Sequence, residues 1–344
     1  MFNKELFVSF IPVIFLSFVF SLIISKIVIP ILRGHKIGQS IRAEGPQSHQ
    51  RKAGTPTMGG ICFIMAMLIA LAIMSLIFVF TGRQAELLPM AFTLILALAN
   101  GLIGFIDDYA KLIKKQNEGL TPKAKLILQT LAAVIYVAAL EIFTELSTAI
   151  RIPFTSVSIE LGWGFYIFAV FLIVGIVNST NLTDGIDGLA SSVTIVVMLF
   201  FAAVGLTVFE SVALTLLSGA MMGVLFGFLV FNSHPAEVFM GDTGSLFIGG
   251  IVCGAAFMIG QPLIIVIAGG IYVIEALSVM IQVTVFKATK RSPKGPKRVF
   301  RMTPIHHHFE LNKQGERGWS EKKIVAVFTA VTFLLCVAAW FGIQ

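Results

Sequence analysis

Long apolar runs separated by short polar connections make up most of this sequence. Crossing a membrane as a helix takes about 20 apolar residues, and ten runs approach that length. The runs are continuously apolar, whereas the strands of a membrane barrel alternate polar and apolar positions. The pattern therefore predicts an all-α polytopic membrane protein, a single domain over residues 1–344 with about ten transmembrane helices. The expected spans are 7–32, 58–81, 89–106, 124–146, 164–181, 189–208, 212–231, 245–260, 263–286 and 323–343.

The composition requires lipid around the chain. Hydrophobic residues make up 57% of the 344 residues and charged residues 12%, against about 45–50% and about 25% in soluble domains. These proportions exclude two soluble domains, an intrinsically disordered chain and a collagen-like repeat. Cys62, Cys253 and Cys336 lie in apolar runs without Cys-x-x-Cys spacing, so no disulfide framework or thiolate metal site is expected. The first run continues from Leu6 to Leu32, which predicts a retained span rather than a cleaved signal peptide.

Basic residues concentrate in three of the connections. The segments 33–56, 107–125 and 287–323 hold five, five and eleven of the 25 Lys and Arg residues. An excess of Lys and Arg marks cytoplasmic connections, and ten spans place all three segments on one side. We therefore expect both termini outside, in the periplasmic or extracellular space. The cytoplasmic loops are predicted at about 33–56, 107–123, 182–188, 232–244 and 287–322.

All five aspartates lie at cytoplasmic ends of predicted spans. They are Asp107, Asp108, Asp184, Asp187 and Asp242. All six histidines map to the same side, whereas the outer connections carry only scattered glutamates. Side chains that can bind metals or transfer protons thus gather on one face, and we expect the functional site there.

The aspartate motifs also have purely structural explanations. Asp107 and Asp108 directly follow the third predicted span. They are either solvated loop charges or a pair of repelling carboxylates that needs a nearby cation. In the segment 178–188, Asn-Ser-Thr-Asn-Leu-Thr-Asp-Gly-Ile-Asp-Gly, either Thr183 or Asp187 is a candidate cap for the next helix. One cap does not require two Asp and two Asn, and the N-terminus of a helix also favours phosphate.

Two further motifs each have both a structural and a functional interpretation. The Gly-Asp-Thr-Gly turn at 241–244 is either a helix cap or part of a binding site, and Phe239 before it is a lipid-facing ring or a stacking platform. His306, His307 and His308 point in different directions as successive residues. Donors to phosphate therefore fit this triplet at least as well as a zinc site, which in helices uses i, i+4 spacing.

Glu275 lies inside the ninth predicted span. A carboxylate within a membrane is costly, so it is a functional candidate by default. If the span begins near Pro262, Glu275 lies close to mid-depth, where transporters hold their ions. A partner such as Gln282 or a backbone group is the structural alternative. A secondary transporter is thus the rival interpretation, although the polar residues crowd one face and no internal repeat is visible.

Together these side chains predict a metal-dependent phosphoryl-type transferase at the inner membrane surface. Oxygen ligands without accessible thiolates suit Mg²⁺, which binds through one or two carboxylates plus substrate phosphates. Lys and Arg beside such a metal would hold a diphosphate, since positioning and charge neutralisation dominate phosphoryl transfer. One substrate would arrive from the cytosol and the other from the bilayer.

Five motifs in order resemble the polyprenyl-phosphate N-acetylhexosamine-1-phosphate transferase superfamily. The His triplet makes the chain similar to its bacterial cell-wall branch, the phospho-N-acetylmuramoyl-pentapeptide transferases. Each motif alone is weak, but together they cover almost the whole chain. The motifs are Gly54-Thr-Pro-Thr-Met-Gly-Gly60, Asp107-Asp-Tyr-Ala-Lys111, Asn181-Leu-Thr-Asp-Gly-Ile-Asp-Gly-Leu189, Phe239-Met-Gly-Asp-Thr-Gly-Ser245 and Pro304-Ile-His-His-His-Phe-Glu310.

The resemblance implies ten transmembrane helices, an active site on the cytoplasmic face of the bacterial inner membrane, a homodimer, Mg²⁺ dependence and no nucleic-acid partner. The implied reaction moves phospho-MurNAc-pentapeptide from UDP-MurNAc-pentapeptide to undecaprenyl phosphate, giving lipid I and UMP. A sister enzyme with a UDP-GlcNAc-type donor is the nearest alternative.

The resemblance also implies roles for matching residues. Asp107, Asp108 and Asp242 would form the catalytic centre, with Asp242 as the Mg²⁺ ligand and the other two as further candidate ligands. Asp107 would act as the base in a single displacement or as the nucleophile in a double one, which the sequence leaves open. Phe239 would stack on uracil. The other implied substrate contacts are Lys52, Thr57, Lys111, Lys123, Asn181, Asp184, Asp187, Asn232, Gly241, Gln282, His306, His307 and His308.

Overall fold

The computed structural model describes residues 4–34, 54–114, 119–144, 146–291, 295–312, 314 and 318–343. Ten helices in these residues are long and apolar enough to cross a membrane, which confirms the predicted number. The long helices are α1 (Lys4–Gly34), α2 (Gly60–Phe80), α3 (Leu88–Lys114), α4 (Pro122–Phe143), α5 (Trp163–Thr183), α6 (Leu189–Thr207), α7 (Val212–Asn232), α8 (Gly241–Met258), α10 (Gly270–Thr289) and α12 (Glu321–Gly342). The shorter elements are η2 (Gln84–Leu87), β1 (Ala149–Arg151), β2 (Ser158–Glu160), α9 (Ile264–Ala268) and α11 (Ile305–Glu310).

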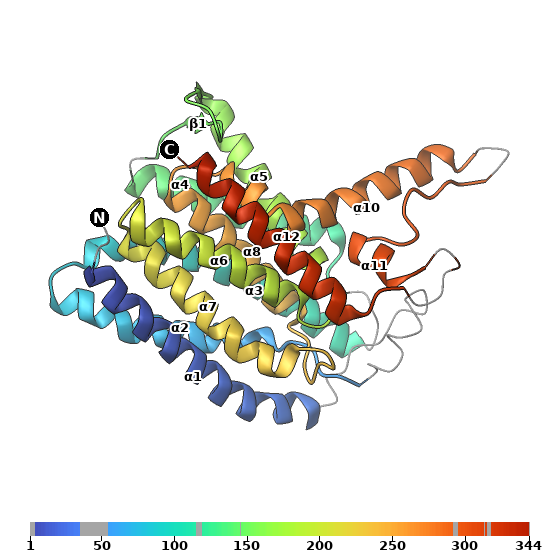
Figure 1. The fold of residues 1–344 in the computed structure, drawn as a ribbon, viewed down its shortest axis with the longest axis horizontal. Coiled ribbons are helices and arrows are strands. Elements are labelled where there is room, and N and C mark those ends of the chain that lie inside the picture. Colours follow the sequence, from blue (N-terminus) through green and yellow to red (C-terminus); the bar gives the residue numbers. More distant parts are fainter. Residues whose placement is uncertain are drawn as a thin grey trace.

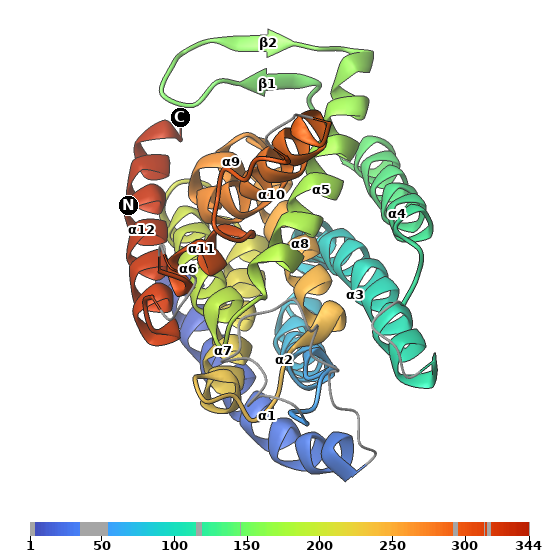
Figure 2. The ribbon, with the colours of Figure 1, turned by 90° about the vertical axis from the view of Figure 1, so that its right-hand side faces the viewer.

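The long helices run side by side, with α8 near the centre of the bundle (Figures 1 and 2). It packs against α2, α3, α5, α6 and α7. In its most apolar stretch 83% of the residues are buried, against 22% in α1 and 28% in α12. The inner helices therefore form the core, and the outer helices present apolar side chains that the hydrocarbon of a bilayer would cover.

The close contact between α3 and α8 positions the acidic motifs. Gly104 of α3 lies so near the backbone of Asp242 that any side-chain carbon there would collide with it. Small residues at helix contacts allow backbones within a membrane to approach closely. The C-terminal half of α3 is thereby held against the first turn of α8.

Two of the helix boundaries that differ from the predicted ones move acidic residues into helices. α3 continues past the predicted end at residue 106, so Asp107 and Asp108 lie within a helix and not in a loop. Lys111 lies one turn after Asp107 and pairs with it at 2.6 Å, which stabilises the added turns. α8 begins at Gly241 rather than 245, which places Asp242 in its first turn, where a negative charge is favourable.

The ninth predicted span, 263–286, is interrupted. α9 ends at Ala268, and α10 runs from Gly270 to Thr289, because Gly269 between them has weak helix propensity. α10 then projects from the bundle, and α11 returns to lie beside it (Figure 1). A β-hairpin that the sequence did not predict joins α4 to α5, with Ile150 opposite Ile159 in its antiparallel register.

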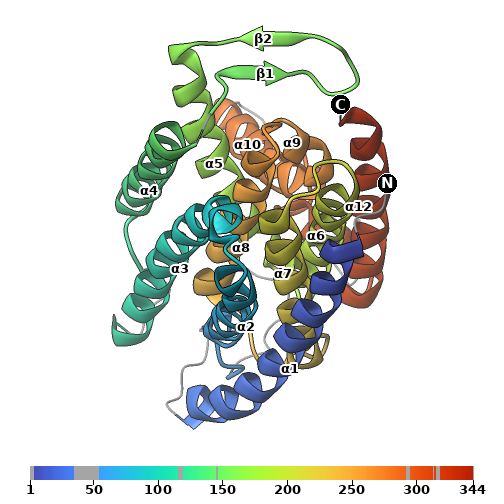
Figure 3. The same cartoon turned by 90° about the vertical axis from the view of Figure 1, so that its left-hand side faces the viewer.

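Both termini lie at the same end of the bundle, as an even number of spans requires (Figures 1 and 3). The ends of α3 and α5 and the beginnings of α4 and α8 lie at the opposite end. The acidic and basic side chains described first come from these helix ends.

Candidate active site

Asp107 and Asp108 of α3 and Asp242 of α8 form one carboxylate cluster. One oxygen of each lies within 4.8 Å of the other two. Asp107 and Asp108 are buried, and Asp242 is partly exposed. Three anions this close repel one another and require positive charge between them.

Two lysine ammoniums supply that charge. Nζ of Lys111 lies 2.6 Å from Oδ2 of Asp107, 3.6 Å from Oδ1 of Asp108 and 3.2 Å from Oδ2 of Asp242. Nζ of Lys125, in α4, lies 2.7 Å from the same oxygen of Asp242. The cluster is therefore compensated by cations that come from two different helices.

Lys125 is a site residue that the sequence analysis missed. Its helix begins at Pro122, after Thr121, whose hydroxyl accepts a backbone N–H of the first turn. Residues two apart on a helix point about 200° apart, so Lys123 and Lys125 face different ways. Lys125 meets Asp242, whereas Lys123, which the resemblance implied, is exposed. The capping Thr121 and the proline after it were the sequence signal for where α4 begins, and therefore for which lysine faces Asp242.

Asp108 is held by the N-terminus of α8. Its Oδ2 accepts the N–H of Thr243 at 3.0 Å and the hydroxyl of Thr243 at 2.8 Å, and its Oδ1 accepts the N–H of Asp242 at 3.3 Å. N–H groups at a helix start have no partner within the helix, and the helix dipole favours an anion there. Asp108 thus caps α8 from a neighbouring helix, which leaves it less available to a metal than Asp107 or Asp242.

Single hydrogen bonds orient the other two carboxylates. Oδ1 of Asp107 accepts the N–H of Leu120 at 2.9 Å. Oδ1 of Asp242 accepts a hydrogen bond from the Asn181 amide at 2.8 Å, and that amide also donates to the hydroxyl of Ser245 at 2.8 Å. In both carboxylates the other oxygen, Oδ2, faces the lysines.

The donors of this cluster fit a hard divalent cation. Carboxylate oxygens are the protein ligands that Mg²⁺ prefers, and the Lys111 ammonium already places positive charge among three of them. Asp107 and Asp242 would hold the ion through the oxygens that face Lys111 and Lys125. The three cysteines are buried in spanning helices, and none of them belongs to this cluster.

Asp184 follows the last residue of α5, near the cluster. Burial raises the pKa of its carboxyl well above the ordinary value, and the charges of Asp242, Asp108 and Asp187 raise this pKa further. A cation bound in the cluster would offset part of this repulsion. The charge of Asp184 is therefore linked to the occupancy of the carboxylate cluster.

Asp187 belongs to a second group of side chains. Its Oδ2 lies 3.0 Å from Nδ1 of His234 and accepts the N–H of Ala236 at 3.1 Å. Oε2 of Glu321, in α12, lies 3.5 Å from the same His234 nitrogen and accepts the N–H of Asp187 at 3.2 Å. The alternative that Thr183 or Asp187 caps α6 is wrong, because Gly188 occupies the capping position and no side chain caps the helix. Asp187 instead ties two loops to α12.

The Thr57 and Phe239 motifs lie side by side at the cluster. Two backbone hydrogen bonds of 2.8 Å join Phe239 to the segment 56–59. Gly241, the first residue of α8, lies close to the hydroxyl of Thr57 and to the carboxylate of Asp108. The Phe239 ring is partly exposed, so it offers a face at the edge of the cluster.

Two residues implied as substrate contacts form hydrogen bonds that brace loops. The buried Asn232 side chain donates to the carbonyl of Val238 at 3.0 Å and accepts the hydroxyl of Ser191 at 3.2 Å. The Gln282 oxygen accepts the N–H groups of residues 299 and 300 at 2.9 and 3.0 Å. The suggested pairing of Gln282 with Glu275 is therefore wrong.

The three successive histidines have three different partners. Nδ1 of His306 lies 3.0 Å from Oε1 of Glu275, and Nδ1 of His307 lies 2.8 Å from Oε2 of Glu310. All four of these side chains are buried. His308 is only partly buried. The structure thus separates the triplet into two buried residues and one that reaches the surface.

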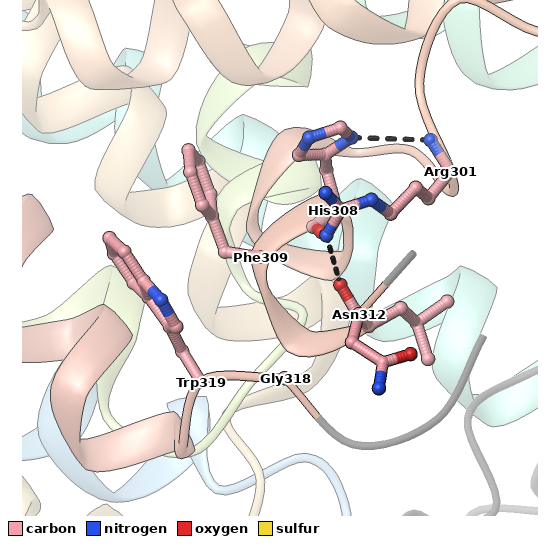
Figure 4. A pocket seen from close by; sticks show the side chains of 7 residues that line it. Arg301, His308, Phe309, Asn312, Gly318 and Trp319 are labelled. Carbon is pink, nitrogen blue, oxygen red and sulfur yellow. Dashed lines mark hydrogen bonds between the residues drawn. The ribbon is translucent and has the colours of Figure 1, made fainter. Parts of the chain in front are cut away.

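His308 lines a pocket of about 320 Å³ with Arg301 and with the stacked rings of Phe309 and Trp319 (Figure 4). Its Nδ1 accepts the N–H of Arg301 at 3.2 Å, so a neutral ring carries its proton on Nε2. Burial and the Arg301 charge lower the pKa of His308. At neutral pH this residue therefore offers an uncharged N–H donor beside the pocket.

Comparison with known proteins shows which family this chain matches. Residues 90–260 match glycosyl transferase family 4, and residues 52–64 match signature 1 of the phospho-N-acetylmuramoyl-pentapeptide-transferases. The chain is 44% identical to the phospho-N-acetylmuramoyl-pentapeptide-transferase of Bacillus subtilis (strain 168) over 325 residues, 94% of each chain. The chain belongs to the phospho-N-acetylmuramoyl-pentapeptide-transferase family.

Other phospho-N-acetylmuramoyl-pentapeptide-transferases match equally well. The protein of Acetivibrio thermocellus is 44% identical over 334 residues, 96% of this chain and 94% of the relative. The protein of Bacillus pumilus is 45% identical over 325 residues, 94% of each chain. Ten apolar helices and this membership make the protein a multi-pass membrane enzyme. Lys52 lies in the matched signature but outside the described residues.

Proposed function

We propose that this protein transfers phospho-MurNAc-pentapeptide from UDP-MurNAc-pentapeptide to undecaprenyl phosphate, producing lipid I and UMP, the first membrane step of peptidoglycan synthesis. The observation that carries the proposal is the carboxylate cluster of α3 and α8, which two lysines compensate at one end of a membrane bundle. Such a cluster is suited to a metal and a diphosphate. The names of the relatives supply the identity of the transferred group.

The transfer exchanges one phosphorus–oxygen bond for another. In a single displacement, an oxygen of the lipid phosphate bonds to the phosphorus that carries the sugar. The bond from that phosphorus to the bridging oxygen breaks, and UMP leaves with the electron pair. We assign Asp107 to accept a proton from the lipid phosphate. In a double displacement, a carboxylate oxygen of Asp107 would instead bond to this phosphorus as UMP leaves. The lipid phosphate would then bond to the phosphorus and displace the Asp107 carboxylate.

Lys111 and Lys125 are suited to receive the diphosphate. Both ammoniums contact Oδ2 of Asp242, and each would exchange this carboxylate for a phosphate oxygen as the substrate binds. Negative charge that develops on the departing UMP is stabilised most by cations already held in place. The fixed position of Lys125 near the start of α4 provides such a cation.

Mg²⁺ is the metal that we assign to Asp242, with Asp107 as a second ligand. When bound, the ion neutralises the diphosphate and the charge that forms on the leaving group. Asn181 orients Asp242 through its amide, and Asp108 holds the helix start that carries Asp242. We therefore assign a positioning role to Asp108.

The nucleoside is assigned to the edge of the cluster beside Asp184, Phe239 and Gly241. The partly exposed Phe239 ring offers an aromatic face for uracil. Its backbone is held by the segment 56–59, which limits its movement. We assign the outer part of the donor, beyond the sugar, to the side of α11 and His308.

We further propose that the cluster faces the cytoplasm of a bacterial inner membrane. Most Lys and Arg residues lie in connections at this end of the bundle, which is the cytoplasmic pattern. The substrates fit this placement, because a nucleotide sugar comes from the cytosol and a polyprenyl phosphate from the bilayer. The homodimer that the resemblance implies remains a prediction.

Release of UMP in detergent tests the proposed reaction. With Mg²⁺, undecaprenyl phosphate and UDP-MurNAc-pentapeptide, the purified protein should release UMP and form lipid I, and omission of the lipid phosphate should stop sustained turnover. Faster release from UDP-GlcNAc would identify a sister transferase. Solute uptake into proteoliposomes without UMP release would contradict the proposal and favour a transporter.

The two displacement routes are distinguished without the lipid phosphate. In a double displacement, wild-type protein retains a labelled phosphosugar after UMP release, and the Asp107→Asn variant retains none. In a single displacement, neither protein becomes labelled.

A further inference from the structure

Glu275 is a fully buried carboxylate in α10 that the proposed reaction does not use. Its side chain is 0% exposed, and its Oε1 lies 3.0 Å from Nδ1 of His306, which is also 0% exposed. Oε2 accepts the backbone N–H of His306 at 3.5 Å. Glu275 thus holds both the ring and the backbone of the residue that follows Ile305 at the start of α11.

The other side of the His306 ring lies against the loop between α5 and α6. A side-chain carbon at Gly185 would collide with Nε2 of His306. This nitrogen is buried and has no hydrogen-bond partner among the described residues. The ring is therefore wedged between Glu275 and Gly185, with its unpaired nitrogen directed at the loop.

Gly185 directly follows Asp184 and lies two residues before Asp187. The loop is therefore continuous with the carboxylate cluster on one side and with the His234 and Glu321 group on the other. A shift of the His306 ring would move the backbone that sets the position of Asp184. The contact links α10 and α11, which project from the bundle, to the edge assigned to the nucleoside.

Burying a carboxylate and an imidazole costs free energy unless the two groups form a well-oriented hydrogen bond with each other. A carboxylate that accepts the proton of Nδ1 fixes the tautomer and the orientation of a histidine ring. The ring is inaccessible to a ligand on every side, since its exposure is zero. In this structure the contacts of the His306 ring are with the protein itself.

We infer that Glu275 is a positioning residue that acts through His306 on the loop 184–187 and thereby sets the affinity for the nucleotide sugar. The inference rests on the proposed function and assigns to the intramembrane carboxylate a role in substrate binding rather than in ion transport. Glu275 orients the ring, the ring supports Gly185, and Gly185 fixes the Asp184 backbone.

A double-mutant cycle tests whether Glu275 acts through His306. Glu275→Ala and His306→Ala should each raise KM for UDP-MurNAc-pentapeptide about tenfold, the effect of one buried charge-assisted hydrogen bond. The double variant should show about the same increase, since both changes break one contact. KM for undecaprenyl phosphate should change less than about twofold, and Met280→Ala, an exposed position on α10, should match wild type.

The conservative variant separates orientation from folding. Glu275→Gln keeps an oxygen that accepts the proton of Nδ1, so KM for the donor should return to within about threefold of wild type. Multiplicative effects of Glu275→Ala and His306→Ala, about 100-fold in the double variant, would overturn the inference. Equal changes in KM for both substrates, or a loss of kcat alone, would also overturn it.

A second cycle approaches the contact from the loop and is independent of turnover. Gly185→Ala should lower the midpoint of thermal unfolding in detergent, and His306→Ala should remove most of that added loss by making room for the methyl group. An undiminished loss in the double variant would contradict the contact. If wild-type protein releases no UMP, the proposed function fails, while this unfolding cycle still tests the Glu275–His306–Gly185 arrangement.

Discussion

Nζ of Lys125 lies 2.7 Å from Oδ2 of Asp242, and Nζ of Lys111 lies 3.2 Å from the same oxygen. One carboxylate oxygen thus holds two cations from two helices. Such an arrangement places the charge needed for a diphosphate beside the oxygen assigned to the metal. Each lysine would contact a phosphate oxygen when the substrate binds.

Lys125→Met should reduce kcat/KM for the donor by about 10- to 100-fold, because it removes a charge-assisted contact of about 1.5–3 kcal/mol. Lys123→Met removes the same charge from a side chain that points away from Asp242. Steady-state UMP release by the two variants gives the comparison. A larger loss in Lys123→Met would mean that the resemblance, and not the contact, identifies the functional lysine.

Asp108→Asn should destabilise the protein more than it alters metal binding. The amide would present N–H groups to the N–H groups at the start of α8, so a loss of about 2–3 kcal/mol is expected. Thr243→Val removes the one hydrogen bond that a hydroxyl donates to the same carboxylate and should cost about 1.5 kcal/mol. Unfolding in detergent measures both changes. Equal stability of Asp108→Asn and wild type would contradict the capping role.

The acidic residues show how far the sequence could predict this site. Carboxylates at the ends of separate spans had to share one face, because the topology places those ends together. Their partners were not predictable in the same way. Whether Lys123 or Lys125 meets Asp242 depends on where α4 begins, and a shift of two residues reverses the answer.

Tertiary contacts account for the remaining differences. α3 continues through Asp107 and Asp108 because Lys111 and the start of α8 neutralise them. The pair with Lys111 is a local pattern, but the contact with α8 is not. The partner of Glu275 is 31 residues away in α11, beyond any helical periodicity. The β-hairpin lies between two apolar spans, and its three-residue strands are too short to give a recognisable strand pattern in the sequence.

Asp184→Asn should stabilise the protein at neutral pH. Because the pKa of Asp184 is raised in the folded protein, folding favours the protonated carboxyl. The contribution of this carboxyl to the free energy of unfolding is complete below the ordinary pKa of an aspartate. It is lost as the pH rises through the pKa of the folded state. The neutral amide avoids that loss. The unfolding midpoint of Asp184→Asn should therefore exceed that of wild type at pH 8, and the difference should shrink toward pH 4.

Mg²⁺ should reduce the pH 8 difference between Asp184→Asn and wild type, because the ion offsets the repulsion from Asp242 and Asp108. Asp184→Asn unfolding below wild type at pH 8 would show that the ionised carboxyl has a stabilising partner instead.

The proposed cytoplasmic placement of the cluster predicts the sidedness of two exposed segments. Thr155, in the β1–β2 hairpin, should lie outside, and Arg298, after α10, should face the cytoplasm. An impermeant maleimide added to intact cells should label Thr155→Cys and not Arg298→Cys, with little background because the native cysteines are buried. Labelling of Arg298→Cys alone would reverse the orientation.

Divalent-ion dependence of wild type and Asp242→Asn tests the central assignment most directly. UMP release is titrated with Mg²⁺, and Mn²⁺ binding to the same proteins is followed by electron paramagnetic resonance. Wild type should bind Mn²⁺ saturably and require the ion, whereas Asp242→Asn should bind it far more weakly and lose about 10³-fold or more in kcat. Wild-type Mn²⁺ affinity together with wild-type UMP release in Asp242→Asn would contradict the assignment.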